Sequence, residues 1–384
     1  MRGVSRGVTL LMAALLLAVV LLCSCARQGS EVRGTLAVRV GVVAPLTGPA
    51  AVWGQWLKQG VSIALREYKA GQSKFDVRVI YEDSQGDPAK AVSAVQKLIS
   101  VDKVQVVYGP LTSAEVLAVA PIAEKAKVVL LTPSASSRQI TSAGRYIFRT
   151  YPSDQEQSIA LARYCHSKMS ARAFGILYKS DDFGQGVKDD FARELRRLGV
   201  GRIAVEGFQP GASDFRTSIA KLKQFRPEVT LIVGMPDELG TILRQSRELA
   251  FHTRFVSTAN IENPEVLKMA GSAADGVVYG SVLYDDTSQV ARRFRAEYQG
   301  EFKTQDKPGL GVALAHDGMS VLLDAIMRAS RPTPTAIGQA LGSTHDYPAL
   351  TGSITFDANG DVVKHFALKA IRQGKFVVLS QRID

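Results

Sequence analysis

Short runs of β-branched and other apolar residues recur along the chain. They cover residues 38–43, 76–81, 104–108, 128–131, 173–178, 203–207, 229–233 and 276–279. Between most of them, apolar residues repeat with the helical period, over 89–100, 113–125, 186–198, 215–225 and 238–250. Near-continuous apolar strands that alternate with amphipathic helices are typical of a parallel sheet with helices on both faces. The pattern therefore predicts an α/β fold built from βαβ units.

The alternation of predicted strands and helices changes at two places along the chain. Near residues 151–154 a strand-like segment ends, and Ser153-x-x-Glu156 predicts a capping box that opens a new helix. This seam divides the units into two groups of similar size, which favours two sheets over one very wide sheet. After residue 280 the pattern predicts longer helices over 288–301 and 312–329, and then a hairpin over 365–371 and 375–379.

Two strand ends in the first group run directly into Ser/Thr-x-x-Glu/Gln boxes. Residues 107–111 lead into Thr112-Ser113-Ala114-Glu115, and residues 131–135 lead into Ser136-Ser137-Arg138-Gln139. We expect Thr112 and Ser136 to be helix N-caps, with free first-turn N–H groups that can hold an anion. Ligands of open α/β sheets lie at such strand ends. Many α/β proteins nevertheless cap helices in this way where no ligand binds.

The amino terminus has the pattern of an export signal. Arg2 and Arg6 precede an unbroken apolar run over 10–22, which is shorter than the roughly 20 residues that cross a bilayer. The segment Leu22-Cys23-Ser24-Cys25 resembles a bacterial lipobox. We expect residues 1–24 to be removed and Cys25 to be lipidated, because Leu22 is too bulky for cleavage before Cys23. An ordinary secretory signal is the alternative.

Export would place the protein on the outer face of a bacterial membrane, in the periplasm or at the cell surface. Residues 26–37 are small and polar, as a flexible spacer should be, so residues 25–37 are expected to be a lipidated cysteine and its tether. Cys165 would then be the only thiol outside the signal and anchor, which excludes an internal disulfide.

Composition and charge narrow the function further. The chain has 384 residues, of which 46% are hydrophobic and 22% charged, as in ordinary globular proteins. Its net charge of +11 falls to +9 once Arg2 and Arg6 are removed. The remaining basic residues are interspersed with acids on expected helix faces, and no basic stripe is interleaved with aromatic residues. A nucleic-acid partner is therefore not expected.

No pattern in the chain predicts catalysis. Gly-x-Ser-x-Gly, Gly-x-x-x-x-Gly-Lys-Ser/Thr and His-Glu-x-x-His are all absent from the sequence, and its five histidines lack metal-ligand spacing. His316 and Asp317 come nearest to a catalytic pair, but adjacent residues on a helix point apart. We expect His316 to lie at the surface or at the edge of the core, and expect neither enzymatic activity, nor a cofactor, nor a metal.

Over residues 38–384 the chain resembles the leucine/isoleucine/valine-binding family, the type I periplasmic binding proteins that feed ABC importers. The segments that carry the resemblance are 41–49 with Trp53-Gly54, 82–88, 108–113, 132–136, 148–150, 182–186, 242–245 and Phe356-Asp357-x-x-Gly360-Asp361. No segment is decisive alone, but their order and spacing along the whole chain are specific.

The resemblance implies two α/β lobes that close on a ligand and are joined by three crossovers, near 151–154, 281–284 and 361–364. Lobe 1 would comprise residues 38–152 and 284–361, and lobe 2 residues 153–283 and 362–384. It implies a monomer that delivers a small solute to ABC permease subunits in the membrane. An envelope sensor or regulator with the same fold, which binds a protein partner, is the alternative function.

The resemblance also implies a ligand site. Trp53 matches an aromatic residue that packs on the ligand, and Phe183 matches an aromatic of the opposing lobe that is usually Tyr. Ser113 matches a residue that binds the ligand carboxylate through its N–H and hydroxyl, and Ser136 has a similar role. Ser134 matches a residue whose carbonyl accepts from the ligand amine. The set is completed by Thr112, Ala135, Met235, Ala259 and Asn260.

The chain departs from the family at Ala259. Amino-acid-binding relatives have an acidic side chain there, which neutralises the ligand ammonium, whereas this loop reads Ser257-Thr258-Ala259-Asn260-Ile261-Glu262. Burying an unpaired ammonium is costly. We therefore expect a carboxylate-bearing or polar organic solute, with branched-chain amino acids possible but not favoured. Glu262 would compensate only if the loop had a different shape.

Overall fold

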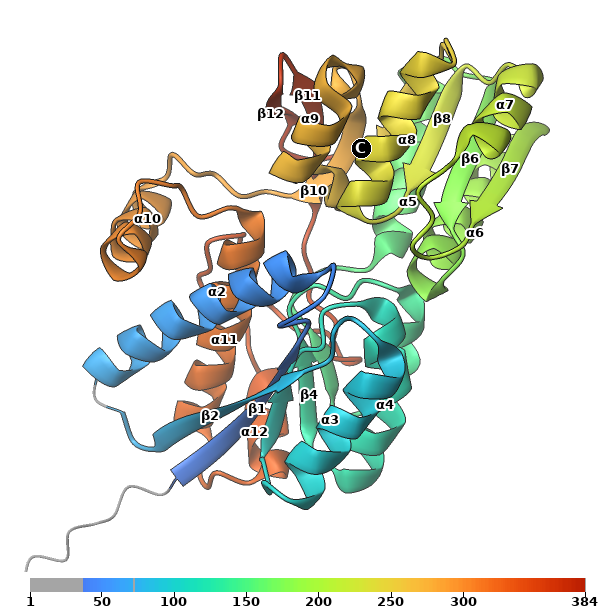
Figure 1. The fold of residues 1–384 in the computed structure, drawn as a ribbon. Coiled ribbons are helices and arrows are strands. Elements are labelled where there is room, and N and C mark those ends of the chain that lie inside the picture. Colours follow the sequence, from blue (N-terminus) through green and yellow to red (C-terminus); the bar gives the residue numbers. More distant parts are fainter. Residues whose placement is uncertain (1–36, 72, 384) are drawn as a thin grey trace, which may run out of the picture. The chain divides into compact units, whose positions relative to one another are not determined.

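The computed structural model describes residues 37–71 and 73–383. The predicted signal peptide, the lipidation site Cys25 and nearly all of the tether lie outside the described residues. From residue 38 onward, helices and strands alternate along the chain, and the strands form two separate sheets (Figure 1).

The first sheet has the strand order β2-β1-β3-β4-β5. Its strands are β1 (Ala37–Ala44), β2 (Asp76–Asp83), β3 (Val106–Tyr108), β4 (Val129–Thr132) and β5 (Ile147–Arg149). Neighbouring strands from β1 to β5 pair in parallel, for example Val42 with Tyr108 and Tyr108 with Leu131. The strand order reverses between β1 and β3. In open α/β sheets, ligands bind beyond the carboxyl ends of the strands at such a reversal.

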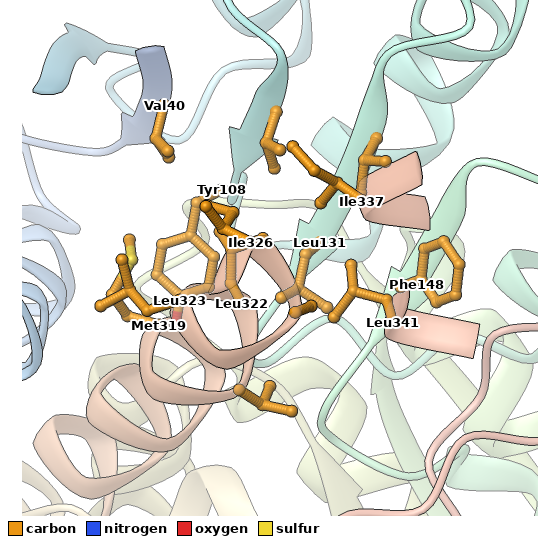
Figure 2. Packing of buried hydrophobic residues seen from close by; sticks show 14 of the residues in the cluster. Val40, Tyr108, Leu131, Phe148, Met319, Leu322, Leu323, Ile326, Ile337 and Leu341 are labelled. Carbon is orange, nitrogen blue, oxygen red and sulfur yellow. The ribbon is translucent and has the colours of Figure 1, made fainter. Parts of the chain in front are cut away.

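Successive residues of these strands pack on opposite faces of the sheet. Tyr108 and Leu131 contact the apolar side of helices α2 (Ala51–Ala70), α11 (Leu310–Arg328) and α12 (Pro334–Gly342). Figure 2 shows this core, with Met319 and Leu322 of α11 beside the Tyr108 ring. Val107 and Leu130, each one residue away, pack instead against α3 (Pro88–Ser100) and α4 (Ser113–Ala126). The sheet is therefore covered by helices on both faces.

Helix α2 approaches α11 closely because the α2 residue at the contact is a glycine. A Cβ on Gly60 would lie 2.6 Å from the backbone N of His316 and from the backbone O of Val312. Among the described residues, α11 is the one helix long and apolar enough to cross a membrane, but most of it is buried inside the protein. This burial explains its apolar composition as that of a core helix.

The second sheet has the order β12-β11-β10-β9-β8-β6-β7. Its strands are β6 (Ala173–Lys179), β7 (Arg202–Phe208), β8 (Val229–Val233), β9 (Arg254–Ser257), β10 (Val278–Val282), β11 (Phe366–Arg372) and β12 (Lys375–Ser380). Pairing is parallel from β7 to β10, and the carboxy-terminal hairpin adds β11 and β12 in antiparallel fashion. The order reverses between β6 and β8, as it does between β1 and β3.

Helices also cover both faces of the second sheet. Ile176 and Leu231 pack with α5 (Asp154–Ser167) and α6 (Asp182–Arg197), whereas Leu177 and Ile232 pack with α7 (Arg216–Phe225), α8 (Pro236–Glu248) and α9 (Pro264–Ala270). We call the first sheet with its helices lobe 1 and the second sheet with its helices lobe 2.

The chain passes between the lobes three times. It leaves β5 for α5, leaves β10 for α10 (Gln289–Phe302), whose Phe294 packs on Ile63 of α2, and returns to β11. The predicted fold class, with two parallel-sheet lobes and three crossovers, is therefore confirmed. The residue at which each lobe begins and ends remains a prediction. Strand β9 and helices α2, α9 and α12 are elements that the sequence pattern did not predict.

Two of the crossover segments are joined by a buried arginine. Arg149 at the end of β5 is fully buried, and its Nη2 lies 2.5 Å from Oδ2 of Asp361. Its Nη1 donates to the carbonyls of Ser136 and Ser137 at 3.1 and 2.8 Å. Because the charge of Arg149 is met by a carboxylate and two carbonyls, this ion pair is compensated within the protein.

Candidate functional site

The predicted site residues lie just beyond the carboxyl ends of strands in both sheets. Segments 111–114 and 133–136 follow β3 and β4, while Phe183, Met235 and 258–260 follow β6, β8 and β9. Trp53 lies in the first turn of α2, after β1. These are the strand ends next to the reversals of strand order, where open α/β sheets bind ligands.

Two cavities lie among these residues, with volumes of about 120 and 60 Å³. Six residues line both cavities, namely Trp53, Leu111, Ser134, Ser136, Phe183 and Asn260. Those that line only the smaller one are Thr112, Ser113, Ala114, Ala135, Asp181 and Met235. Ala259 lines only the larger one. All ten predicted ligand residues therefore line one or both of these neighbouring cavities, and a single water needs only ~10–15 Å³ of such space.

The smaller cavity contains the amino terminus of α4. Thr112 is its N-cap, and the predicted capping box is present: the Thr112 Oγ1 accepts from the N–H of Glu115 at 3.3 Å, and the Glu115 Oε2 accepts from the N–H of Thr112 at 3.1 Å. The N–H groups of Ser113 and Ala114 have no intrahelical partner at this end of the helix. Both residues line the cavity, and free N–H groups at a helix amino terminus suit a carboxylate.

The Ser113 hydroxyl connects the two strand ends. Its Oγ accepts from the N–H groups of Ser136 and Ser137 at 3.3 and 3.1 Å, and within the described residues its own hydrogen has no acceptor. The expectation that Ser136 is a helix N-cap is wrong. The cap is Ser137, which opens a short 3₁₀ turn (Arg138–Ser142), because the Ser136 hydroxyl donates instead to Asp154.

Each aromatic residue shared by the two cavities is followed by a glycine that its backbone requires. A Cβ on Gly54 would lie 2.1 Å from the carbonyl O of Pro45, and a Cβ on Gly184 would lie 2.1 Å from that of Lys179. Each glycine lets a helix begin directly against the preceding strand end. Trp53 and Phe183 are thereby placed on the same site from lobe 1 and lobe 2.

The loop before Trp53 is held by one carboxylate. Asp83 Oδ1 accepts from the N–H of Leu46 at 2.8 Å and from that of Thr47 at 3.3 Å. Burial opposes ionisation of Asp83, but hydrogen bonds from Thr47, Gln85 and Leu46 outweigh it and lower its pKa. The start of α2 is thus fixed by a charged acceptor.

The remaining predicted residues belong to lobe 2. Met235 is the N-cap of α8, where its N–H donates to Oε2 of Glu238 at 2.8 Å. Asn260 donates through Nδ2 to the carbonyl of Gly234 at 3.0 Å. Ala259 begins a 3₁₀ turn (Ala259–Ile261) and presents no carboxylate to the larger cavity.

Two carboxyl groups lie at the larger cavity. The sequence analysis did not assign Asp154 to the site, and it gave Glu262 little weight. Asp154 lines the larger cavity, and burial raises the pKa of its carboxyl to about 7, because the Ser136 hydrogen bond and the Arg149 charge offset only part of the lost solvation. Glu262 also lines it, but both of its oxygens accept from Lys369 Nζ, at 2.9 and 3.0 Å. Neither group is therefore an uncompensated anion at neutral pH.

Among the other polar residues at the larger cavity that the sequence reasoning did not assign to the site are Tyr151, Thr258 and Asn263, all of them buried. The sequence did contain a sign that Lys369 has a buried partner, because Lys369 is the one charged residue in the otherwise apolar run Phe366–Ile371. Such a lysine needs a buried partner, although the sequence does not say which.

His316 is not part of this site. Its Nε2 lies 2.9 Å from Oε2 of Glu67 on α2, so it bridges the two packed helices near the protein surface. The expected core-edge position is correct. Among the described residues there is no group of three or more His, Cys, Asp or Glu side chains that could hold a metal.

The fold and the site together define a two-lobed protein with cavities at the strand ends of both sheets. A model of the family described as "Periplasmic binding protein" matches residues 37–374. The chain therefore belongs to the periplasmic binding protein family, which is one of solute-binding proteins.

Proteins of similar sequence and structure are known. The chain is 26% identical over 329 residues to the leucine-, isoleucine-, valine-, threonine- and alanine-binding protein of Pseudomonas aeruginosa, a match that spans 85% of this chain and 87% of that protein. A leucine-binding protein of Thermotoga maritima superposes with a TM-score of 0.83 at 26% identity, covering 89% of this chain and 98% of that one. A third similar protein is a branched-chain amino acid transporter substrate-binding protein of Streptococcus pneumoniae, solved with isoleucine. It superposes with a TM-score of 0.79 at 25% identity, covering 90% of this chain and 99% of that one.

Proposed function

We propose that this chain is the extracytoplasmic substrate-binding protein of an ABC importer, anchored to the membrane through a lipid on Cys25. It captures a small carboxylate-bearing or amino-acid-like solute between Trp53 and Phe183 and delivers it to a membrane permease. The observation that carries the proposal is the pair of free N–H groups at Ser113 and Ala114, in a cavity shared by residues of both lobes. The named ligands of the relatives support a small organic acid.

The solute carboxylate would bind at the smaller cavity. The N–H groups of Ser113 and Ala114 and the Ser113 hydroxyl can each donate to it, and the positive end of α4 favours negative charge there. The rings of Trp53 and Phe183 would pack on the body of the solute.

We favour a solute without an α-ammonium group. Ala259 has no charge, Glu262 is neutralised by Lys369, and the carboxyl of Asp154 is only partly ionised near neutral pH. An ammonium buried here would therefore lack a full counter-charge, which is costly. No observation on this chain or its relatives favours the regulator alternative.

Mass spectrometry of solute released from the purified protein, followed by calorimetry with a panel of acids, tests the proposal. We expect a small carboxylate to be released and to rebind with micromolar or better affinity. Micromolar or better affinity for leucine or valine would contradict the preference against amino acids, but not the transport role. A flat thermal-shift screen across acids, amides and amino acids would contradict solute binding itself.

A further inference from the structure

One wall of the larger cavity is apolar and comes from two packed helices of lobe 1. Helix α2 contributes Trp53, Trp56 and Leu57, and α11 contributes Leu310, Gly311, Leu314 and Ala315. Trp56 was not among the predicted ligand residues, and it lines this cavity but not the smaller one. Because Trp53 and Trp56 are three residues apart, they lie on the same face of α2. Two aromatic rings from one helix therefore border the larger cavity.

The indole of Trp56 is held in place by a glycine of α11. A Cβ on Gly311 would lie 2.5 Å from Cε3 of Trp56, and 3.1 and 3.2 Å from Cδ2 and Cζ3, which all belong to the six-membered part of the indole. The glycine therefore lets this ring lie directly against the helix backbone. Trp56 also packs against the small apolar cluster that contains Ile63 and Phe294. A ring whose position is fixed before binding loses little freedom when a ligand packs on it.

Most polar side chains of the larger cavity already have partners in the protein. These are Ser134 and Ser136 through their hydroxyls, Asn260 through Nδ2, Asn263 through Oδ1, and Glu262 through both carboxylate oxygens. The hydroxyl oxygens of Tyr151 and Thr258 are sealed from the cavity space, so they are not presented to a ligand. The cavity therefore offers a ligand mainly apolar surface.

The two cavities differ in size as well as in chemistry. Their volumes are about 120 and 60 Å³. An apolar cavity of roughly 150 Å³ is large enough to take up benzene, so the larger cavity is close to the size of one aromatic ring. The smaller cavity is lined by Ser113 and Ala114 at the amino terminus of α4, which suits a carboxylate. Because the two cavities share six lining residues, one small solute can occupy both.

We propose that the solute is an aryl carboxylate with one aromatic ring in the larger cavity, and that Trp56 is a specificity-determining residue that packs on this ring. This inference rests on the proposed function and names its ligand class. The face of an aromatic ring is negative and its edge is positive, so two aromatic rings attract each other by more than their buried area accounts for. A saturated ring of similar size fills the cavity but lacks this attraction.

Calorimetry with pairs of acids of similar shape tests the inference. The pairs are benzoate with cyclohexanecarboxylate, and 3-phenylpropanoate with 3-cyclohexylpropanoate. In each pair that binds, we expect the aryl member to bind about two- to tenfold more tightly, the range that an aromatic pair contributes beyond buried area. Equal or tighter binding of the saturated members would overturn the inference.

Variants test the part played by Trp56. Trp56→Leu should reduce the preference for the aryl members at least twofold, whereas Trp56→Phe should keep most of it. Phe302→Leu is the matched control, because Phe302 packs in the same apolar cluster as Trp56 but lines neither cavity. Its preference should be that of the native protein. A native preference in Trp56→Leu would overturn the role of Trp56.

Failure of this inference can be told apart from failure of the proposed function. If other acids of the calorimetric panel bind but none of the aryl probes does, the ligand class is wrong and the transport role stands. If no acid of the panel binds, the proposed function fails and the inference with it.

Discussion

Ser136 and Asp154 are joined by two hydrogen bonds that run in opposite directions. The Ser136 hydroxyl donates to the Asp154 carboxylate, and the Asp154 N–H donates to the Ser136 carbonyl at 2.9 Å. The loop after β4 is thereby fixed to the first turn of α5, at the larger cavity. The carboxyl group of Asp154 is therefore held as an ionisable group inside the proposed site.

Binding of a carboxylate should therefore weaken as the pH rises through 7. The pKa of Asp154 is raised to about 7, so the carboxyl becomes an anion between pH 6 and 8 and repels a bound carboxylate. We expect roughly a fivefold loss of affinity, about 1 kcal/mol, at constant ionic strength. Calorimetry at both pH values checks this, and Asp154→Asn should remove the dependence. An affinity that rises with pH would contradict it and indicate a cationic solute.

Trp53→Ala should weaken solute binding by about 2 kcal/mol or more, a loss typical of a binding hot spot. The Trp53 ring lines both cavities, so its removal takes away the aromatic surface on the lobe 1 side of the site. Titration calorimetry measures the change. Val52→Ala, one residue earlier and 42% exposed, should bind as the native protein does. Native affinity in Trp53→Ala would refute the contact.

Gly311→Ala should narrow the larger cavity. A Cβ at this position would lie 2.5 Å from the Trp56 ring, and both residues line the cavity. Overpacking of this kind costs about 1–3 kcal/mol, so we expect a lower melting temperature together with weaker binding. Gly309→Ala is the control, because a Cβ there would have no neighbour within 4 Å. Equal melting and affinity in the two variants would show that Trp56 moves aside freely.

Stability should fall as the pH rises from about 6.5 to about 9, through His316. Burial lowers the pKa of this imidazole, but the hydrogen bonds that it donates to the carboxylates of Asp317 and Glu67 outweigh burial and raise the pKa to about 9. Because the folded protein binds this proton more tightly than the unfolded chain does, the contribution is complete below pH 6.5 and is lost as the pH approaches 9. It amounts to about 3.5 kcal/mol at roughly 1.4 kcal/mol per pKa unit.

Thermal melts of Glu67→Gln across this range check the assignment. The variant should lose stability at pH 6 and show a flatter pH profile than the native protein. His252→Gln removes an exposed histidine and should leave the profile as it is. A native profile in Glu67→Gln would mean that the ion pair between α2 and α11 contributes nothing measurable.

Cys25→Ser should release the protein from the membrane. Without the thiol no lipid can be attached, so the mature chain is expected in the soluble fraction of the producing bacterium. Fractionation followed by immunoblotting measures the distribution. Cys23→Ser, which leaves the proposed anchor in place, should stay with the membrane. Release of both variants, or of neither, would contradict anchoring through Cys25.

Most strands could be predicted because parallel strands buried on both faces read as continuous apolar runs. Strand β9 was missed because it is short and begins with the exposed Arg254. Helix α2 was missed because Gly54 and Gly60 interrupt its apolar face. Those glycines are required by contacts with a strand end and with α11, and such contacts cannot be read from one segment of sequence.

For the site, the sequence predicted the residues at strand ends but not the partners that come from elsewhere. Thr112 and Glu115 are three residues apart, so their capping box could be predicted locally. Glu262 and Lys369 are separated by 107 residues, and the pairing of β9 with β10 and of β10 with β11 brings them together. The Ser136 cap was predicted wrongly for the same reason, since its competing partner Asp154 lies on another helix.

The ion pair between Arg149 and Asp361 has a mechanical consequence. It joins the end of β5 to the last segment before β11, and both are held to lobe 1 through the carbonyls of Ser136 and Ser137. Any bending of the first and third connections must therefore take place beyond this clamp, in the few residues that lead to α5 and β11. Arg149 and Asp361 are 212 residues apart in the sequence, so this one ion pair holds two distant crossover segments at the same place on lobe 1.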